Sequence, residues 1–164
     1  MEADVPITLR PARDDEDDVR LLREWRNDAA TRAASFSGRE IPWDEHIAWF
    51  EKSLADPSRH IFIALDEGRP VSVVRFDARA GDEGEVHVIV APAARGRGVA
   101  TRVLRAACEL ASRELGYVEI IARIKEDNVA SRRAFARAGF GPERPETLAA
   151  AEGEIPIVVT TWRR

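Results

Sequence analysis

Glycine and arginine alternate in one short segment of the chain, between an apolar run and a helical pattern. Gly96 and Gly98 lack a Cβ atom, so the backbone can turn tightly there and approach an anion. The first amides of the following helix have no internal acceptor, and the helix dipole places partial positive charge beside them. Arg95, Arg97 and Arg102 add formal positive charge. This arrangement predicts a site for a phosphorylated ligand.

The segment completes neither of the two common nucleotide-binding motifs. A P-loop ends in Gly-Lys-Ser or Gly-Lys-Thr, which is absent. The dinucleotide motif G-x-G-x-x-G fails because Thr101 occupies the position of its last glycine. A structural interpretation stays open beside the functional one, in which the glycines form a tight connection and the arginines are solvated.

A second pair of residues suits proton transfer. Glu85 and His87 are two residues apart in the β-like run Glu85–Val90, and alternate residues of a strand share one face. A carboxylate can accept a proton, and an unperturbed imidazole titrates near ~6.5. Both residues also have a structural interpretation, Glu85 as a charged residue after a turn and His87 as a partly buried histidine.

The spacing of apolar residues predicts the elements that position these groups. Helical spacing is found around residues 19–29, 43–54, 98–116 and 129–138, and β-like runs at 5–10, 60–65, 71–76, 85–90, 118–124 and 155–162. Residues 142–153 are expected to form a polar, alanine-rich connection. Hairpins followed by a β-α-β crossover favour an α/β fold of the α+β kind, with a mixed central sheet and helices on its faces.

Composition limits the kind of partner. The 164 residues predict one domain, 1–164, and the net charge of −4 argues against a general nucleic-acid binder. A single cysteine, Cys108, and the lack of zinc-type spacing predict neither a disulfide nor a metal. No stretch reaches the ~20 apolar residues of a membrane span. We expect a cytoplasmic protein whose partner is a small molecule or a protein, with a homodimer as one possible assembly.

The motif Arg95-x-x-Gly98-x-Ala100, between a strand and a helix, resembles the R/Q-x-x-G-x-G/A signature of the GNAT superfamily of acyl-CoA-dependent N-acetyltransferases. Asn128-x-x-Ser131-x-x-x-Phe135 and Gly139-Phe140 are similar to the next segment of that family. The resemblance covers about residues 5–140. It implies the GNAT fold, with six to seven strands and about four helices.

The resemblance also implies acetyl-CoA as the co-substrate, without a metal. Backbone groups of Val88, Ile89 and Val90 would bind the pantetheine arm, and the side chain of Asn128 would hydrogen-bond to it. Amides of the glycine-rich turn would hold the pyrophosphate. The residues implied at this turn are Arg95, Gly96, Arg97, Gly98, Val99, Ala100 and Thr101, and Ser131 and Phe135 complete the cofactor set.

Acetyl transfer to an amine needs a base, and many relatives place a carboxylate where Glu85 stands. Glu85 is therefore the favoured base and His87 the second candidate. Many relatives also carry a tyrosine about seven residues after the asparagine, as a proton donor to the leaving thiolate. Phe135 stands there and cannot donate, and the one tyrosine, Tyr117, lies elsewhere. The sulfur would leave as a thiolate or take a proton from water or another group.

The acceptor amine is expected beside the first two helical segments. Trp25-Arg-Asn, Arg32 and His46-x-x-Trp49-Phe50 resemble the amino-sugar N-acetyltransferases of the pseudaminic acid pathway, which acetylate a UDP-linked sugar. They are also similar to the group that acetylates ribosomal-protein N-termini. The candidate acceptor residues are Arg26, Arg32, Trp43 and His46. A small-molecule amine, with a UDP-linked amino sugar as the candidate, is the first expectation. The alternatives are a peptide N-terminus as the acceptor and a non-catalytic CoA-binding module.

Overall fold

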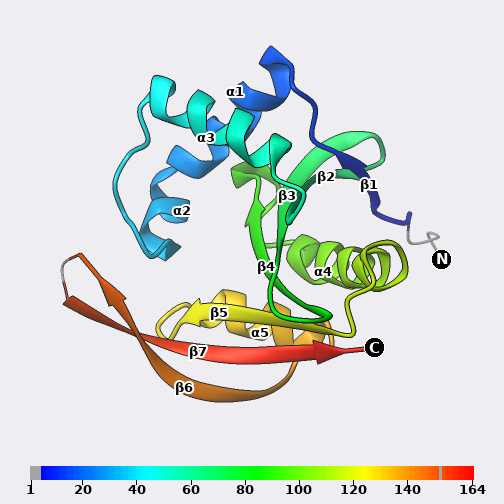
Figure 1. The fold of residues 1–164 in the computed structure, drawn as a ribbon, viewed down its shortest axis with the longest axis vertical. Coiled ribbons are helices and arrows are strands. Elements are labelled where there is room, and N and C mark those ends of the chain that lie inside the picture. The colour runs from blue at the N-terminus through cyan, green and yellow to red at the C-terminus, as the bar shows by residue number, and fades with distance from the viewer. Residues whose placement is uncertain (1–4, 152) are drawn as a thin grey trace.

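A mixed sheet of seven strands forms the centre of the molecule in the computed structural model, which describes residues 5–151 and 153–164 (Figure 1). The strand order is β1-β2-β3-β4-β5-β7-β6. The strands are β1 (Thr8–Pro11), β2 (Arg59–Asp66), β3 (Arg69–Ala78), β4 (Glu83–Val90), β5 (Glu119–Lys125), β6 (Gly141–Ala150) and β7 (Gly153–Arg163). The mixed α/β sheet predicted from the sequence is confirmed.

Five α-helices flank the sheet within the described residues. They are α1 (Glu16–Asn27), α2 (Ala29–Ala34), α3 (Trp43–Ala55), α4 (Val99–Leu110) and α5 (Val129–Arg137). A 3₁₀ turn (Pro92–Ala94) precedes α4, and a π-helical turn (Ala111–Leu115) extends it. The first helical pattern was expected to be continuous, but the chain turns at Asp28. Its side chain accepts a hydrogen bond from the Thr31 amide and so begins α2 as a separate helix.

The prediction of an irregular connection over residues 142–153 is wrong. Most of this segment is β6, which pairs antiparallel with β7 from Gly141 opposite Thr161 to Ala150 opposite Gly153. Two prolines, Pro142 and Pro145, made the sequence look unlike a strand, because proline has no N–H to donate to a β-ladder and is expected only where none is needed. β6 is the last strand of the sheet and largely exposed, so it tolerates them and lacks an apolar pattern.

The feature that matters for a ligand is the divergence of β4 and β5. These neighbours run parallel for three residue pairs, from Glu83 opposite Glu119 to Glu85 opposite Ile121. Beyond Glu85 they separate, as Figure 1 shows, while β4 keeps its partner β3 on the other side as far as Val90. Residues 87–90 of β4 therefore have one edge without a neighbouring strand.

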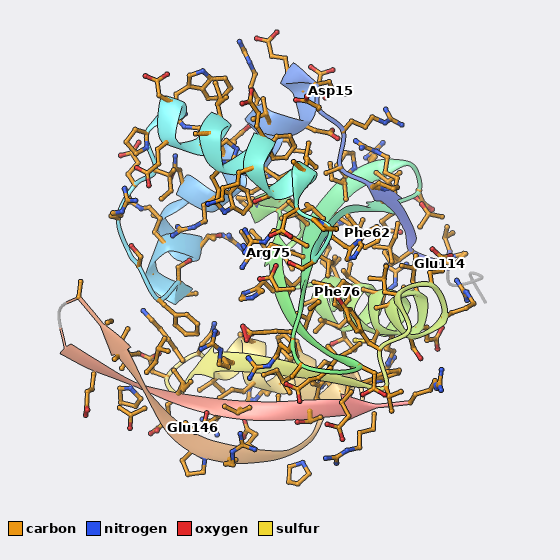
Figure 2. The ribbon with its side chains drawn as sticks, in the orientation of Figure 1. Asp15, Phe62, Arg75, Phe76, Glu114 and Glu146 are labelled. Carbon is orange, nitrogen blue, oxygen red and sulfur yellow. The ribbon has the colours of Figure 1, made fainter. Side chains whose placement is uncertain are left out.

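Both faces of the strands beside this opening are covered. Arg75 and Phe76 are consecutive in β3, so their side chains leave opposite faces of the sheet (Figure 2). Phe76 is fully buried, with its ring centroid 6.4 Å from that of Phe62 and 6.1 Å from that of Tyr117. This aromatic packing holds β2 and β3 from one side and leaves the Arg75 face to α1 and α3. Among the described helices, none is long and apolar enough to cross a lipid bilayer.

Candidate active site

The glycine-rich turn before α4 presents a row of free backbone donors. Gly96 and Gly98 have φ values of +78° and +70°, the left-handed region that favours glycine. Gly98 is the N-cap of α4. The amides of residues 96–101 find no hydrogen-bond acceptor in the described parts of the chain. Several consecutive free amides at a helix N-terminus form an anion site of the kind that holds a pyrophosphate.

The arginines of the turn are mostly engaged within the protein. Arg95 pairs with Asp28 at 2.8 Å and donates to Thr31 Oγ1 at 2.8 Å. Arg97 donates to the Ala93 carbonyl at 3.2 Å, and Arg102 pairs with Asp66 at 2.9 Å. From the sequence, these guanidinium groups were expected beside the anion. The structure shows that the backbone amides are the donors that stay available, and that Arg95 links the turn to α2.

The free edge of β4 continues from this turn. Its backbone groups at Val88 to Val90 can pair with an extended ligand as a further strand would. Asn128 lies at the start of α5, where its side-chain oxygen accepts from the Ser131 amide at 3.2 Å and leaves the side-chain NH₂ group as a donor. Phe135 is buried, with its ring centroid 4.9 Å from that of Phe140, so it belongs to the core.

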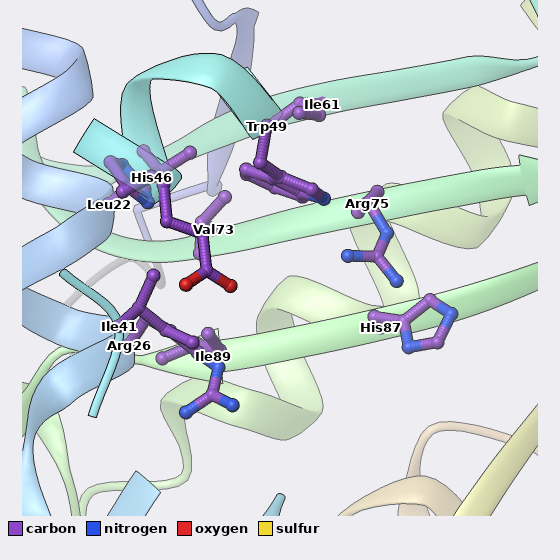
Figure 3. A pocket seen from close by; sticks show the side chains of 11 residues that line it. Leu22, Arg26, Ile41, His46, Trp49, Ile61, Val73, Arg75, His87 and Ile89 are labelled. Atoms are coloured by element: carbon purple, nitrogen blue, oxygen red, sulfur yellow. The ribbon is translucent and has the colours of Figure 1, made fainter. Parts of the chain in front are cut away.

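A pocket of about 230 Å³ lies on the α1 and α3 side of β4 (Figure 3). Helix α1 contributes Leu22 and Arg26, and α3 contributes Glu45, His46 and Trp49. The remaining walls are Ile41, Ile61, Val73, Arg75, His87 and Ile89. The pocket and the free edge of β4 therefore share the same strand segment, residues 87–89.

His87 is oriented by two carboxylates. Its Nε2 lies 3.2 Å from Glu85 Oε2 and 3.4 Å from Asp77 Oδ2. Ionised carboxylates only accept hydrogen bonds, so Nε2 carries the proton and Nδ1 is the basic nitrogen of the neutral ring. No hydrogen bond to Nδ1 is formed within the described residues. His87 thus combines a pocket position with a free basic nitrogen.

Glu85, unlike His87, is buried and held by ion pairs. It is 4% exposed, and its carboxylate receives Arg123 at 2.9 Å and Arg79 at 3.1 Å. Burial by itself would raise the pKa of Glu85, but the hydrogen bonds from His87 and Arg123 outweigh it and lower the pKa to about 2. A carboxylate with so low a pKa is a weak base near neutral pH. The geometry therefore favours His87 over Glu85, the reverse of the order expected from the sequence.

The structure brings together only two of the four predicted acceptor residues. Arg26 and His46 line the pocket, whereas Arg32 and Trp43 are not among its walls. His46 is 2% exposed and donates from Nε2 to the Val19 carbonyl at 2.8 Å, and burial lowers its pKa. It joins α3 to α1. Of the predicted set, Arg26 is the residue best placed to contact an acceptor.

Sequence reasoning missed the charged residues that surround His87. Arg75 lies directly across from His87 in the β3–β4 ladder, and Asp77 lies opposite Glu85. Arg123 reaches Glu85 from β5, across the point where the strands part. One signal was present in the sequence: each of these charges interrupts an otherwise apolar strand. A buried charge is unfavourable without a partner, so charges at such positions predict either ion pairs or a site.

The chain matches the family of acetyltransferase (GNAT) domains over residues 7–141. The chain belongs to the GNAT acetyltransferase family. It is also 33% identical over 149 residues to a mycothiol acetyltransferase of Rhodococcus erythropolis, in a match that covers 82% of this chain and 46% of that protein. The chain therefore spans about half the length of this relative.

Solved GNAT structures share the fold. The spermidine N-acetyltransferase of Vibrio cholerae, solved with CoA and spermine, superposes with a TM-score of 0.82 at 17% identity, covering 96% of this chain and 95% of that one. An aminoglycoside acetyltransferase solved with coenzyme A and kanamycin gives a TM-score of 0.78 at 21% identity, with coverages of 96% and 95%. At these identities the likeness establishes the architecture of the GNAT sheet and helices.

The GNAT turn offers a direct test of the anion site. A Cβ added at Gly98 would meet nothing within 4 Å in the protein, but valine is strained at the φ of +70°, so Gly98→Val should distort the turn and place a branched side chain over the free amides. We expect the Kd for acetyl-CoA, measured by calorimetry, to rise at least about tenfold. Gly68→Val is the matched control, because Gly68 also has a positive φ (+79°) and open space but lies in the β2–β3 turn. Equal Kd values for both variants would contradict this site.

Proposed function

We propose that the chain is an acetyl-CoA-dependent N-acetyltransferase that acts on a primary amine. One observation carries the proposal: the free edge of β4 and the pocket containing His87 meet at residues 87–89. A thioester that follows this edge from the free amides of residues 96–101 would bring its acetyl group to the pocket wall. An amine in the pocket would then lie within reach of both the acetyl carbon and His87 Nδ1.

The proton that the amine loses during acetyl transfer is accepted by a residue of this chain. Acetyl-CoA, when bound, supplies an acyl group on a good leaving group. An ammonium acceptor first loses one proton to solvent, and the neutral amine attacks the acetyl carbon. The C–N bond forms, the C–S bond breaks with its electron pair going to sulfur, and the N–H proton passes to His87 Nδ1. The resulting imidazolium is stabilised by the carboxylates of Glu85 and Asp77, both within 3.4 Å of Nε2.

The sulfur leaves without help from a tyrosine or a cysteine of this chain. Tyr117 is buried against Phe76, and burial raises its pKa. Cys108 is fully buried, and burial raises its pKa to about 12, so it is neither a proton donor nor an acyl carrier at neutral pH. A thiol has a pKa of about 8.5, so departure as the thiolate followed by protonation from water has a small cost.

For the acceptor we propose a small amine, with a nucleotide-linked amino sugar as one candidate. Support comes from α2, which spans the opening between β4 and β5. Asp28 pairs with Arg95 of the turn, and the Ala33 carbonyl accepts from Lys125 of β5 at 2.9 Å. These contacts narrow the open groove that a peptide N-terminus would need. A pocket of about 230 Å³ suits a sugar or amino-acid moiety.

Thiol release from acetyl-CoA tests the proposal. The assay compares UDP-linked amino sugars, other small amines and peptides at equal concentrations. We expect CoA thiol to appear together with an N-acetylated small amine. Turnover restricted to peptides would assign the chain to N-terminal acetylation, and acetyl-CoA binding without turnover of any amine would identify a CoA-binding module.

A further inference from the structure

The pocket contains a cation that the protein leaves uncompensated. Arg26 donates from Nη2 to the Ser37 carbonyl at 2.9 Å, while its Nη1 is buried without a hydrogen-bond partner in the described part of the chain. Burial, and then the charges of Arg39 and Arg32, lower the pKa of Arg26. An unsatisfied buried donor on a charged group is costly, and a bound ligand is one of the few ways to offset that cost when the group lines a pocket.

The remaining charges of the pocket do not neutralise Arg26. Glu45 is the only carboxylate that the described residues contribute to the walls, and it pairs with Arg39 outside them. Arg75 adds a second, partly buried guanidinium, which pairs through Nε with Asp77 and lies over the ring of Trp49 at 5.8 Å. Figure 3 shows Arg26 entering from α1, and Arg75 and His87 entering from the adjacent strands. The pocket is thus rich in positive charge.

This charge pattern is unfavourable for a polycation. A polyamine carries positive charge beyond the reacting nitrogen, and that charge would face Arg26 and Arg75 in a partly desolvated space. An oxyanion on the acceptor would instead be attracted by these guanidinium groups. It would bind the guanidinium of Arg26 and offset a charge that has no ion pair in the described part of the chain.

We propose that the acceptor carries a carboxylate or phosphate group close to its amine, and that Arg26 binds this oxyanion while His87 faces the amine. The inference rests on the proposed acetyl transfer and narrows its acceptor class. Arg26 acts here in substrate recognition, since the proton is transferred at His87. The carboxylate of an amino acid and the phosphate of an amino-sugar phosphate or nucleotide sugar present the same chemistry to the guanidinium.

Pairs of amines that differ only in the anionic group test this inference. Amino acids are compared with their amides, and glucosamine 1-phosphate with glucosamine; spermidine is the cationic member. We expect kcat/KM for the anionic member of at least one pair to exceed that of its neutral partner by at least about tenfold. A higher kcat/KM in the amino-acid pair would identify the oxyanion as a carboxylate, and a higher value in the glucosamine pair would identify it as a phosphate. A preference for neutral amines or spermidine would overturn the inference.

Arg26→Gln supplies the second arm of the test. We expect KM for the anionic amine to rise at least about tenfold, with kcat and the KM of the neutral partner little changed. Arg20→Gln is the matched control, because Arg20 is also on α1 but exposed and paired with Glu16. Equal losses for anionic and neutral amines, or a lowered Tm with unchanged KM, would assign Arg26 a structural role and overturn the proposal.

Failure of the proposed function is separable from failure of this inference. If no amine of any charge releases thiol, acetyl transfer fails. Calorimetric binding of the same amine pairs to the CoA-saturated protein then still measures the preference. Tighter binding of the anionic members that is lost in Arg26→Gln supports the inference, and equal binding of both members overturns it.

Discussion

Replacing His87 with alanine is expected to lower kcat for acetyl transfer by about 10² to 10⁴, the usual contribution of general base catalysis. The variant removes His87 Nδ1, an unpaired basic nitrogen on the pocket wall whose ring is oriented by Glu85 and Asp77. The Kd for acetyl-CoA should stay near the wild-type value, because the free amides of residues 96–101 are backbone groups that the substitution leaves in place. Single-turnover kinetics and calorimetry measure the two quantities separately.

Chemical rescue distinguishes lost chemistry from lost structure. Exogenous imidazole should restore part of kcat in His87→Ala, because a small base can occupy the space left by the side chain. His60→Ala is the control, since His60 is also a half-buried strand histidine but lies on β2, away from the pocket walls. If His87→Ala keeps more than about a tenth of wild-type kcat, the base is not His87.

The elements of the fold could be predicted where local chemistry determines them. Gly98 begins α4 and Gly116 ends its π-helical extension, both in left-handed conformations that glycine adopts readily. The same local rules failed for β6. Its pairing depends on β7, a non-local partner, and its exposed side chains leave no alternation for a single sequence to show.

The candidate site was predictable in its backbone part and less so in its side chains. The turn at Gly96 and Gly98 follows from residue types that permit one backbone path. The low pKa of Glu85 does not follow from residue types, because it depends on a hydrogen bond from Arg123, which is 38 residues away in sequence and adjacent in space. Sequence spacing placed Glu85 and His87 on one face correctly, but only the three-dimensional contacts show which of them can accept a proton.

The second large effect is expected for Glu85→Gln. This substitution should mainly lower the free energy of unfolding and should have a small effect on kcat. In Glu85→Gln the guanidinium of Arg123 and the Nε2 proton of His87 lose an ionised acceptor in a buried site. Because the carboxylate has a pKa of about 2 in the folded protein and about 4.5 when unfolded, its ionised form contributes about 3 kcal/mol to the free energy of unfolding at pH 7. Urea unfolding of both proteins measures this difference.

The pH dependence of the same difference identifies its origin. A pKa that folding depresses contributes stability that is complete above the unfolded value and is lost as the pH falls through the folded value. The carboxylate's own contribution to the gap between wild type and Glu85→Gln should therefore be complete above about pH 5 and shrink from about pH 4.5 towards 2. Glu83→Gln is the matched control: its ion pair with Arg79 is partly exposed, so a change below about 1 kcal/mol is expected.

The kinetics of Glu85→Gln decide between the two candidate bases. If Glu85 only orients His87, kcat should fall by less than about tenfold at a temperature where the variant is folded, because glutamine still offers an oxygen to Nε2. A loss of 10² or more in kcat with little change in the free energy of unfolding would restore Glu85 as the base. That result would also require the hydrogen bonds from His87 and Arg123 to be broken when substrates bind, since a carboxylate held by both is too weak a base to accept the amine proton.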